Sequence, residues 1–90
     1  MTLAGGELTL IGRSYCHLCD EMRSAILRVT QRRGMRLREV DVDDDPALEA
    51  RWGDLVPVLL WQGQEVCHYR FNPRALHDAL EAGAGFAAQA

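Results

Sequence analysis

The sequence predicts a small α/β domain in which a four-stranded mixed sheet is flanked by three helices. Strand-like and helix-like apolar patterns alternate along the chain, and glycine or proline stands at most boundaries between them. The last two strand patterns are separated only by a short turn, which predicts a hairpin. The expected element order is β-α-β-α-β-β-α, in a single domain over residues 1–90 with an ordered core at about residues 7–82.

The composition is that of an ordinary globular protein. Hydrophobic residues make up 48% of the chain, charged residues 26%, and the formal net charge is -3. This balance leaves no basic surface of the kind that binds nucleic acid. The first residues show no basic segment followed by an apolar stretch, and no apolar run approaches membrane-spanning length. We therefore expect a cytoplasmic monomer without nucleic-acid or membrane partners.

The first two elements are predicted to be a strand and a long helix. Residues 7–11 read as the strand, which Gly12 ends. Apolar residues then recur at helical spacing over residues 17–33, and Gly34 follows in the position where glycine often ends a helix. The expected buried stripe of this helix consists of Leu18, Met22, Ile26 and Val29.

The middle of the chain is predicted to continue with an edge strand and a short helix. Residues 35–42 read as the edge strand, because arginine side chains along a strand discourage pairing with another chain. A strand–helix–strand unit of this length has parallel strands joined by a right-handed crossover. Asp45 then caps a short helix, which has Pro46 at its first position and ends at Gly53.

The last third of the chain is predicted to form a hairpin and a helix. An apolar strand over residues 56–61 has proline near its start, a position that sheets tolerate. Residues 62–64 turn the chain, and residues 65–69 return antiparallel. Asn72 caps the last helix, which we expect Gly83 to end.

Two cysteines between the first strand and the first helix carry the chemistry. Cys16 and Cys19 are separated by one helical turn, so their sulfurs can close a disulfide. Cys16 stands in the first turn of the helix, where free backbone N–H groups and the helix dipole favour an anion. This position should lower the pKa of the Cys16 thiol and make it nucleophilic. The odd number of cysteines, three, argues against a secreted disulfide framework.

The Cys-His-Leu-Cys motif at residues 16–19, the Val56-Pro57 pair and the final hairpin and helix resemble the glutaredoxin-like proteins, which have the thioredoxin fold. The resemblance is to a small bacterial branch that carries C-H-L-C in place of C-P-Y-C, and it covers about residues 7–82. It implies an enzyme, a thiol–disulfide oxidoreductase, that reduces protein or mixed disulfides. In that scheme Cys16 is the nucleophile, Cys19 is the resolving cysteine, and the two form a redox disulfide.

The resemblance also implies which neighbouring residues contact the substrate. Pro57 matches the proline that is cis in this fold and faces the disulfide, and Val56 matches the residue whose backbone pairs with the bound thiol. Arg13 matches a basic residue near the thiolate. Tyr15 and His17 flank the nucleophile, and a protonated His17 would stabilise its thiolate.

Two departures from the family pattern concern the electron donor. Residues 69–73 lack the glycine pair that helps to seat glutathione in many glutaredoxins, although Arg70 can meet a carboxylate. The W-C-G-P-C signature of thioredoxins is also absent. The expected substrate is a disulfide-containing protein or a small thiol, with glutathione or a reductase as electron donor and no tightly bound cofactor.

A non-catalytic module of the same fold is the alternative. Its cysteines would bind a partner, a metal ion or an iron–sulfur centre. The available soft ligands are Cys16, His17, Cys19, Cys67 and His68. One C-x-x-C is only half of a zinc site, and Cys67 reads as a small core residue in a strand. The run from Asp41 to Asp45 has Pro46 where a calcium loop requires glycine, which excludes a calcium site there. We therefore predict no metal site.

Overall fold

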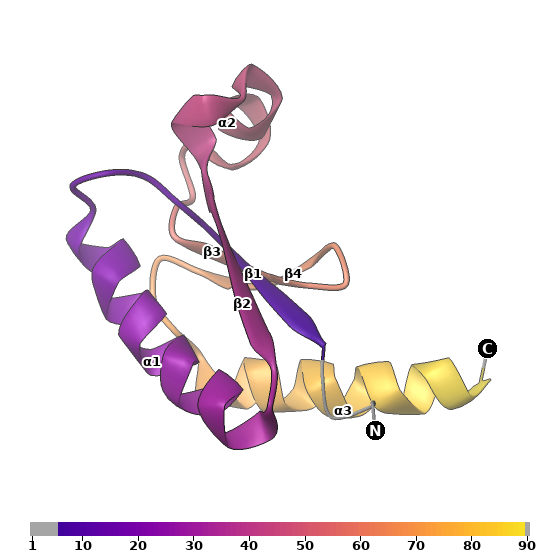
Figure 1. Cartoon of the computed structure of the whole chain (residues 1–90). Helices are drawn as coiled ribbons and strands as arrows, with labels where there is room; N and C mark the ends of the chain where they lie inside the picture. The colour runs from indigo at the N-terminus through magenta and orange to yellow at the C-terminus, as the bar shows by residue number, and fades with distance from the viewer. Residues whose placement is uncertain (1–5, 90) are drawn as a thin grey trace.

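A four-stranded mixed sheet with the order β2-β1-β3-β4 forms the middle of the structure (Figure 1). The computed structural model describes the backbone of residues 6–89 and the side chains of residues 6–82. β1 is parallel to β2 and antiparallel to β3, and β3 and β4 form an antiparallel hairpin. The strands are β1 (Glu7–Gly12), β2 (Arg36–Asp41), β3 (Val58–Trp61) and β4 (Gln64–His68).

Three α-helices cover the two faces of this sheet, which confirms the predicted α/β class and element order. The helices are α1 (His17–Arg33), α2 (Pro46–Trp52) and α3 (Pro73–Gln89), and the short 3-10 helix η2 (Val42–Asp44) precedes α2. In Figure 1, α2 lies at the top of the view and α3 along the bottom. Over residues 6–89, the helices lack the length and apolar character needed to cross a membrane.

Alternating side chains of the strands supply two separate cores. The larger core, which includes residues of α1 and α3, consists of Leu8, Leu10, Met22, Ile26, Leu59, Cys67, Leu76 and Leu80. The smaller core, on the α2 side, consists of Ile11, Val42, Trp52 and Val58. Leu10 and Ile11 are neighbours in β1 but belong to different cores, because consecutive residues of a strand face opposite sides. Both faces of β1 are therefore buried, and this packing holds the end of the strand from which the loop to Cys16 departs.

The ends of α1 agree with the prediction, but its buried stripe is shifted. Gly34 ends the helix in the left-handed conformation, with a φ of 67°, and its N–H donates to the carbonyl of Thr30. The fully buried residues are Cys19, Met22, Ile26 and Thr30. The expected Leu18 and Val29 are only half-buried. Cys19 takes the inner position because its sulfur lies against Gly12, which has no side chain to exclude it.

Several other boundaries differ from the predicted ones, and three of the differences have a clear physical reason. β3 begins at Val58 rather than at residue 56, since proline has no N–H to donate to a strand ladder. Gln64 pairs with Trp61, so the hairpin loop has only two residues, both with positive φ as in a type I′ turn. α3 continues through Gly83 to Gln89, because a glycine costs a helix only about 1 kcal/mol and alanines surround it.

Candidate active site

A disulfide joins Cys16 and Cys19 at the start of α1, with their Cα atoms 5.1 Å apart. Cys16 is the N-cap residue of the helix and has an extended backbone conformation, whereas Cys19 is already in the first turn. The two sulfurs differ in accessibility. Cys16 is half-buried at the surface, and Cys19 has only 3% of its surface exposed. Only Cys16 is therefore placed to react with an external sulfur, either as the attacking or as the attacked atom.

Backbone N–H groups of the first helical turn surround Cys16. The N–H of Cys19 donates to the Sγ atom of Cys16 over 3.1 Å. The N–H of Asp20 donates to the Cys16 carbonyl, also over 3.1 Å. The Cys16 sulfur thus occupies the position that a capping side-chain oxygen holds in other helices. A negative charge there is stabilised by unpaired N–H groups and by the helix dipole.

The end of β1 brings a glycine next to this disulfide, with a proline beside that glycine. A Cβ atom added to Gly12 would lie 3.1 Å from the Sγ of Cys19. Any larger residue at position 12 would therefore press on that sulfur. Ile11 pairs with Val58 across β1 and β3, which places Pro57 beside Gly12 at the same end of the sheet. Pro57 is fully buried.

The segment before β3 is held by the loop that follows β4. The Val56–Pro57 peptide bond is cis. The N–H of Tyr69 donates to the Pro57 carbonyl over 2.9 Å. The hydroxyl of Tyr69 donates to the Asp54 carbonyl over 2.8 Å. These two bonds connect both ends of residues 54–57 to the β4–α3 loop, so the two loops form one surface.

The residues on either side of Cys16 are the most exposed in this region. Tyr15 is fully exposed. Its φ of 59° is a left-handed backbone conformation that residues other than glycine rarely adopt. Such backbone strain is common at functional sites. The imidazole of His17, whose side chain is 84% exposed, lies with Nε2 2.9 Å from a carboxylate oxygen of Glu21. Both flanking side chains are accessible to a partner that reaches Cys16.

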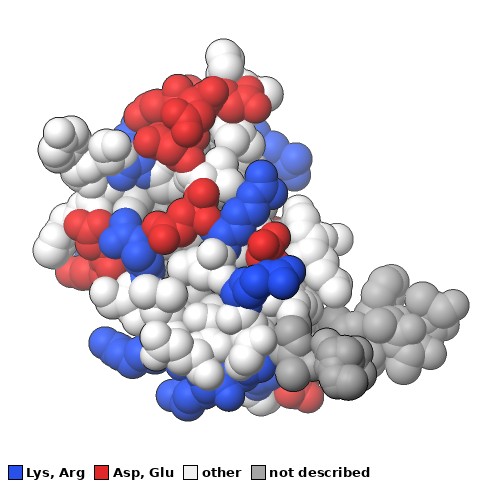
Figure 2. All heavy atoms as spheres, in the orientation of Figure 1, with Lys and Arg blue, Asp and Glu red and all other residues white. Residues whose placement is uncertain are grey.

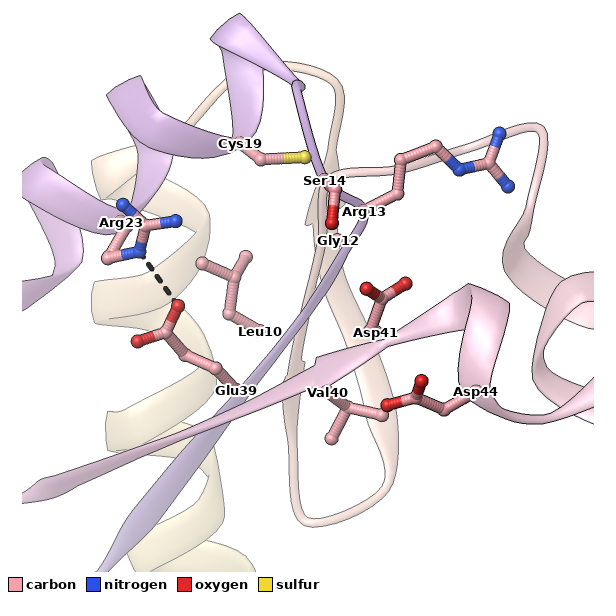
Figure 3. A pocket seen from close by; sticks show the side chains of 10 residues that line it. All are labelled: Leu10, Gly12, Arg13, Ser14, Cys19, Arg23, Glu39, Val40, Asp41 and Asp44. Atoms are coloured by element: carbon pink, nitrogen blue, oxygen red, sulfur yellow. Dashed lines mark hydrogen bonds and ion pairs between the residues drawn. The ribbon is translucent and has the colours of Figure 1, made fainter.

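Arg13 is turned toward η2 and α2. Its guanidinium forms an ion pair with Asp43 at 3.6 Å and another with Glu49. Figure 3 shows the Arg13 side chain directed away from Cys19. A Cβ atom at Gly53 would collide with the Glu49 carboxylate, so this glycine leaves the space in which Glu49 meets Arg13. Arg13 therefore joins the loop before Cys16 to α2, an arrangement that the sequence pattern did not predict.

A polar pocket of about 290 Å³ lies beside the buried sulfur of Cys19. It is lined by Leu10, Gly12, Arg13, Ser14, Cys19, Arg23, Glu39, Val40, Asp41 and Asp44. Figure 3 shows the Cys19 sulfur directed toward Gly12 and Ser14. Arg23 donates from Nε to Glu39 over 2.7 Å at one side of the pocket. This hydrogen bond raises the pKa of Arg23 above its usual value.

A second hollow lies on the other side of α1. It has a volume of about 300 Å³ and is lined by Leu18, Glu21, Met22, Tyr69, Arg70 and Phe71. Leu18, Met22 and Phe71 give it an apolar part, and Glu21 and Arg70 supply opposite charges. Arg70 is exposed and makes no ion pair with any residue in the described part of the chain.

The third cysteine lies apart from the disulfide. Cys67 is buried in the larger core, where burial raises the pKa of its thiol. A smaller opposing effect comes from the Asn72 backbone, which lowers the pKa. Among residues 6–82, no three His, Cys, Asp or Glu side chains come together as possible metal ligands. Cys67 is thus a core residue here, as the sequence predicted.

Gly12, Ser14 and Asp41 line the polar pocket beside Cys19 but were not predicted to be site residues. Gly12 read as the end of a strand, and Asp41 was considered only as part of a calcium loop that the sequence excluded. The signal that could have found them is the parallel pairing of β1 with β2, whose register sets Gly12 opposite Asp41. That register depends on where each strand starts, which the apolar pattern of the second strand leaves open.

The chain matches the Glutaredoxin-like domain family (DUF836) over residues 7–81. The chain belongs to this family. Protein XcR50 from X. campestris, whose structure is known, is 39% identical, with a TM-score of 0.63, and the match covers 83% of this chain and 96% of that one. Protein Ne2328 from Nitrosomonas europaea is 28% identical, with a TM-score of 0.75, covering 82% and 89%.

More distant similarities agree with this assignment. An uncharacterized protein of Mycobacterium tuberculosis is 25% identical over 75 residues, covering 78% of this chain and 77% of the relative. Thioredoxin 1 from Thermosipho africanus is 17% identical, with a TM-score of 0.58 and coverage of 87% and 98%, and it shows the shared fold alone. The predicted glutaredoxin-like resemblance is confirmed. A C-x-x-C pair in this fold suggests a redox function.

Replacing His17 by alanine is expected to make the disulfide of this glutaredoxin-like domain slightly harder to reduce. A protonated imidazole beside Cys16 stabilises the thiolate of the reduced form, so its loss lowers the reduction potential. An exposed pair of opposite charges contributes about 0.2–1 kcal/mol, which corresponds to a change of roughly 4–20 mV in potential. Equilibration with glutathione buffers measures this change.

The partner of His17 supplies the matched variant for that measurement. Glu21→Gln removes the carboxylate that lies against the imidazole, so its effect on the potential should have the opposite sign. Equal potentials for the parent protein and His17→Ala would remove His17 from the redox chemistry.

Proposed function

We propose that this glutaredoxin-like domain is a thiol–disulfide oxidoreductase that reduces protein or mixed disulfides with the Cys16/Cys19 dithiol. The observation that carries the proposal is the difference between the two sulfurs. Cys16 is half-buried at the surface and its sulfur accepts a backbone N–H bond at a helix N-terminus, while Cys19 is 3% exposed one turn away. A nucleophile needs the first environment and a resolving thiol needs the second.

In the first step, the Cys16 thiolate attacks one sulfur of the substrate disulfide. A new bond forms between Cys16 and that sulfur, the substrate S–S bond breaks, and the other substrate sulfur leaves as a thiolate that takes a proton. The first-turn N–H groups stabilise the attacking thiolate.

In the second step, Cys19 loses its proton and attacks Cys16. The Cys16–Cys19 bond forms, the mixed disulfide breaks, and the remaining substrate sulfur leaves as a thiolate. The two electrons of the dithiol have then passed to the substrate. A 5.1 Å separation between the Cα atoms lets the bond close without movement of the backbone.

The surface around Cys16 supports a substrate that extends beyond its disulfide. We place the substrate against Tyr15, His17 and the loop of Val56 and Pro57. Arg13 holds the β1–α1 loop, which carries Tyr15, in place. The hollow lined by Leu18 and Arg70 adjoins the first turn of α1 and offers an apolar contact and a cation. Glutathione or a reductase then returns the protein to the dithiol form, and neither has to stay bound between turnovers.

The reactivity of Cys16 in the reduced protein tests this proposal. Its alkylation rate, followed against pH by mass spectrometry of the modified peptide, should have a midpoint below the value of about 8.5 for a free cysteine. Cys67 is the internal control, because burial raises the pKa of its thiol and should slow its reaction. A Cys16 midpoint at or above that of a free thiol would contradict an activated nucleophile.

A turnover assay separates this function from a non-catalytic module. The assay follows reduction of a mixed disulfide with glutathione and glutathione reductase, and then with a chemical dithiol as reductant. Turnover with either donor supports the oxidoreductase. Absence of turnover with both, together with a metal or cluster in the purified protein, would favour the module instead.

A further inference from the structure

The buried sulfur of Cys19 has to lose a proton before it can attack. Cys19 enters the reaction as a thiol, and only its thiolate is nucleophilic. With 3% of its surface exposed, this residue has little direct contact with bulk water. Its side chain lines the polar pocket of about 290 Å³. A pocket of this size and polarity can hold water that bridges polar groups.

The pairing of β1 with β2 places Asp41 on the face of the sheet against which that sulfur lies. A Cβ atom on Gly12 would point at the Cys19 sulfur, 3.1 Å away. Gly12 and Asp41 are register partners in the two parallel strands, which lie about 4.8 Å apart in sheets. Side chains at paired positions project from the same face of a sheet. The Asp41 side chain therefore projects from the face against which the Cys19 sulfur lies.

The rest of β2 agrees with this orientation. Val40 and Val42 pack in the smaller core on the α2 face. Leu37 packs against the larger core, and Glu39 reaches Arg23 on α1. Residues 37, 39 and 41 thus alternate onto the α1 face, as the two-residue period of a strand requires. Figure 3 shows the Asp41 carboxylate rising toward Ser14, on the pocket side of the strand.

The two arginines of the pocket and Glu39 are already held in ion pairs. From α1, Arg23 bonds Glu39 of β2 at 2.7 Å and pairs with Asp20 at 3.1 Å. From the β1–α1 loop, Arg13 is held by Asp43 and Glu49.

Two pocket carboxylates of the described chain remain without an ion pair, those of Asp41 and Asp44. Asp44 is exposed on η2, and Asp41 is half-buried. One oxygen of Asp41 accepts the N–H of Asp43 over 2.8 Å, and its other oxygen has no such partner among the described residues.

We propose that Asp41 accepts the proton of the Cys19 thiol in the resolving step, through water in this pocket. The proposal rests on the oxidoreductase function argued above. The Cys19 S–H bond breaks, its electron pair forms the bond to Cys16, and the proton passes to the Asp41 carboxylate. The mixed-disulfide bond breaks, and the substrate sulfur leaves as a thiolate with the bonding electron pair of that S–S bond. Asp41 then returns its proton to water, or to Cys19 when the disulfide is reduced again.

A stopped-flow experiment with 5,5′-dithiobis(2-nitrobenzoate) separates the two steps. Attack by Cys16 releases one coloured thiolate at a rate proportional to the reagent concentration. Attack by Cys19 then releases a second coloured thiolate at a rate independent of that concentration. Asp41→Asn is the test variant, because asparagine keeps an oxygen for the N–H of Asp43. Asp44→Asn is the matched control, since it removes the exposed carboxylate of the same pocket.

In Asp41→Asn we expect an unchanged first phase and a second phase roughly 10²-fold slower at pH 7, the lower end of general-base effects. The slowed phase should rise about tenfold per pH unit, because hydroxide must replace the lost acceptor, while the parent rate changes less steeply with pH. Asp44→Asn should match the parent protein. Formate added to Asp41→Ser, which keeps a capping oxygen, should restore part of the second phase.

Two outcomes would overturn the assignment of Asp41 alone: a parent-like second phase in Asp41→Asn, or equal slowing in both variants. Thermal melting of each variant separates a folding defect from a kinetic one, and the unchanged first phase is a further check of an intact site. Absence of a second phase in the parent protein would overturn the oxidoreductase function itself, and this inference with it.

Discussion

Replacement of Cys16 by serine is expected to reduce disulfide turnover to the uncatalysed background. A serine hydroxyl remains protonated where a thiol at a helix N-terminus ionises, so the variant lacks the nucleophile. The serine oxygen can still accept the N–H of Cys19, as many N-cap residues do. The fold should therefore persist. The coupled reduction of a mixed disulfide by glutathione measures the loss, and circular dichroism measures the fold.

The other two cysteines supply the controls for this result. Cys19→Ser should retain the first step and accumulate a mixed disulfide on Cys16, visible as an added mass. Cys67→Ser should keep near-parent turnover, since Cys67 lies in the core away from the disulfide. Full turnover in Cys16→Ser, or an adduct found on Cys67 instead, would contradict the assignment of the nucleophile.

Replacement of Ile26 by alanine is expected to give a large loss of stability. Ile26 is 0% exposed and packs in the larger core. Its truncation leaves a cavity and costs about 2–5 kcal/mol. A domain of this size loses roughly 4–8 °C of melting temperature per kcal/mol. Urea unfolding and thermal melting of the oxidised protein measure the effect.

The next residue in the helix provides the matched control. Leu27 is 37% exposed, so Leu27→Ala should change the stability by no more than about 0.5 kcal/mol. Alkylation of Cys16 in the folded fraction should be similar in both variants, because neither residue contacts the disulfide. Equal destabilisation by the two substitutions would contradict the orientation of α1 on the sheet.

Local signals were enough to predict most of the fold. Glycine at position 34 and proline at position 46 mark a helix end and a helix start, and both boundaries agree with the structure. Arginines along residues 36–38 predicted an edge strand, and β2 is at the edge of the sheet. The end of α3 was wrong because helix-favouring alanines outweigh one glycine, a balance that no single residue reveals.

The site was predicted only where it depends on neighbours in sequence. Cys16 and Cys19 are one turn apart in any helix, so their proximity followed from spacing. Arg13 meets Glu49 across 36 positions of sequence, and no local pattern encodes that contact. Cys19 rather than Leu18 faces the sheet, and its sulfur lies where Gly12 has no side chain. This contact depends on how β1 and α1 pack, which the sequence pattern does not show.

The distribution of charge also emerges only in three dimensions. Figure 2 shows acidic side chains gathered at the top of the view, over η2 and α2, and arginines along the lower edge. The acidic segment carries Asp43, Asp44, Asp45 and Glu49. Arg13 neutralises part of this charge from the neighbouring loop. The net charge of -3 is thus unevenly distributed over this face of the molecule.

The burial of Cys67 has a consequence for the integrity of the oxidised chain. While the core is intact, this third thiol is buried and cannot exchange with the disulfide of the other two cysteines. Once the chain unfolds, the freed thiol can attack either sulfur of the bond and exchange partners with it. Heating the oxidised protein at alkaline pH should then yield scrambled isomers, whereas a chain without that thiol should return to a single species on cooling.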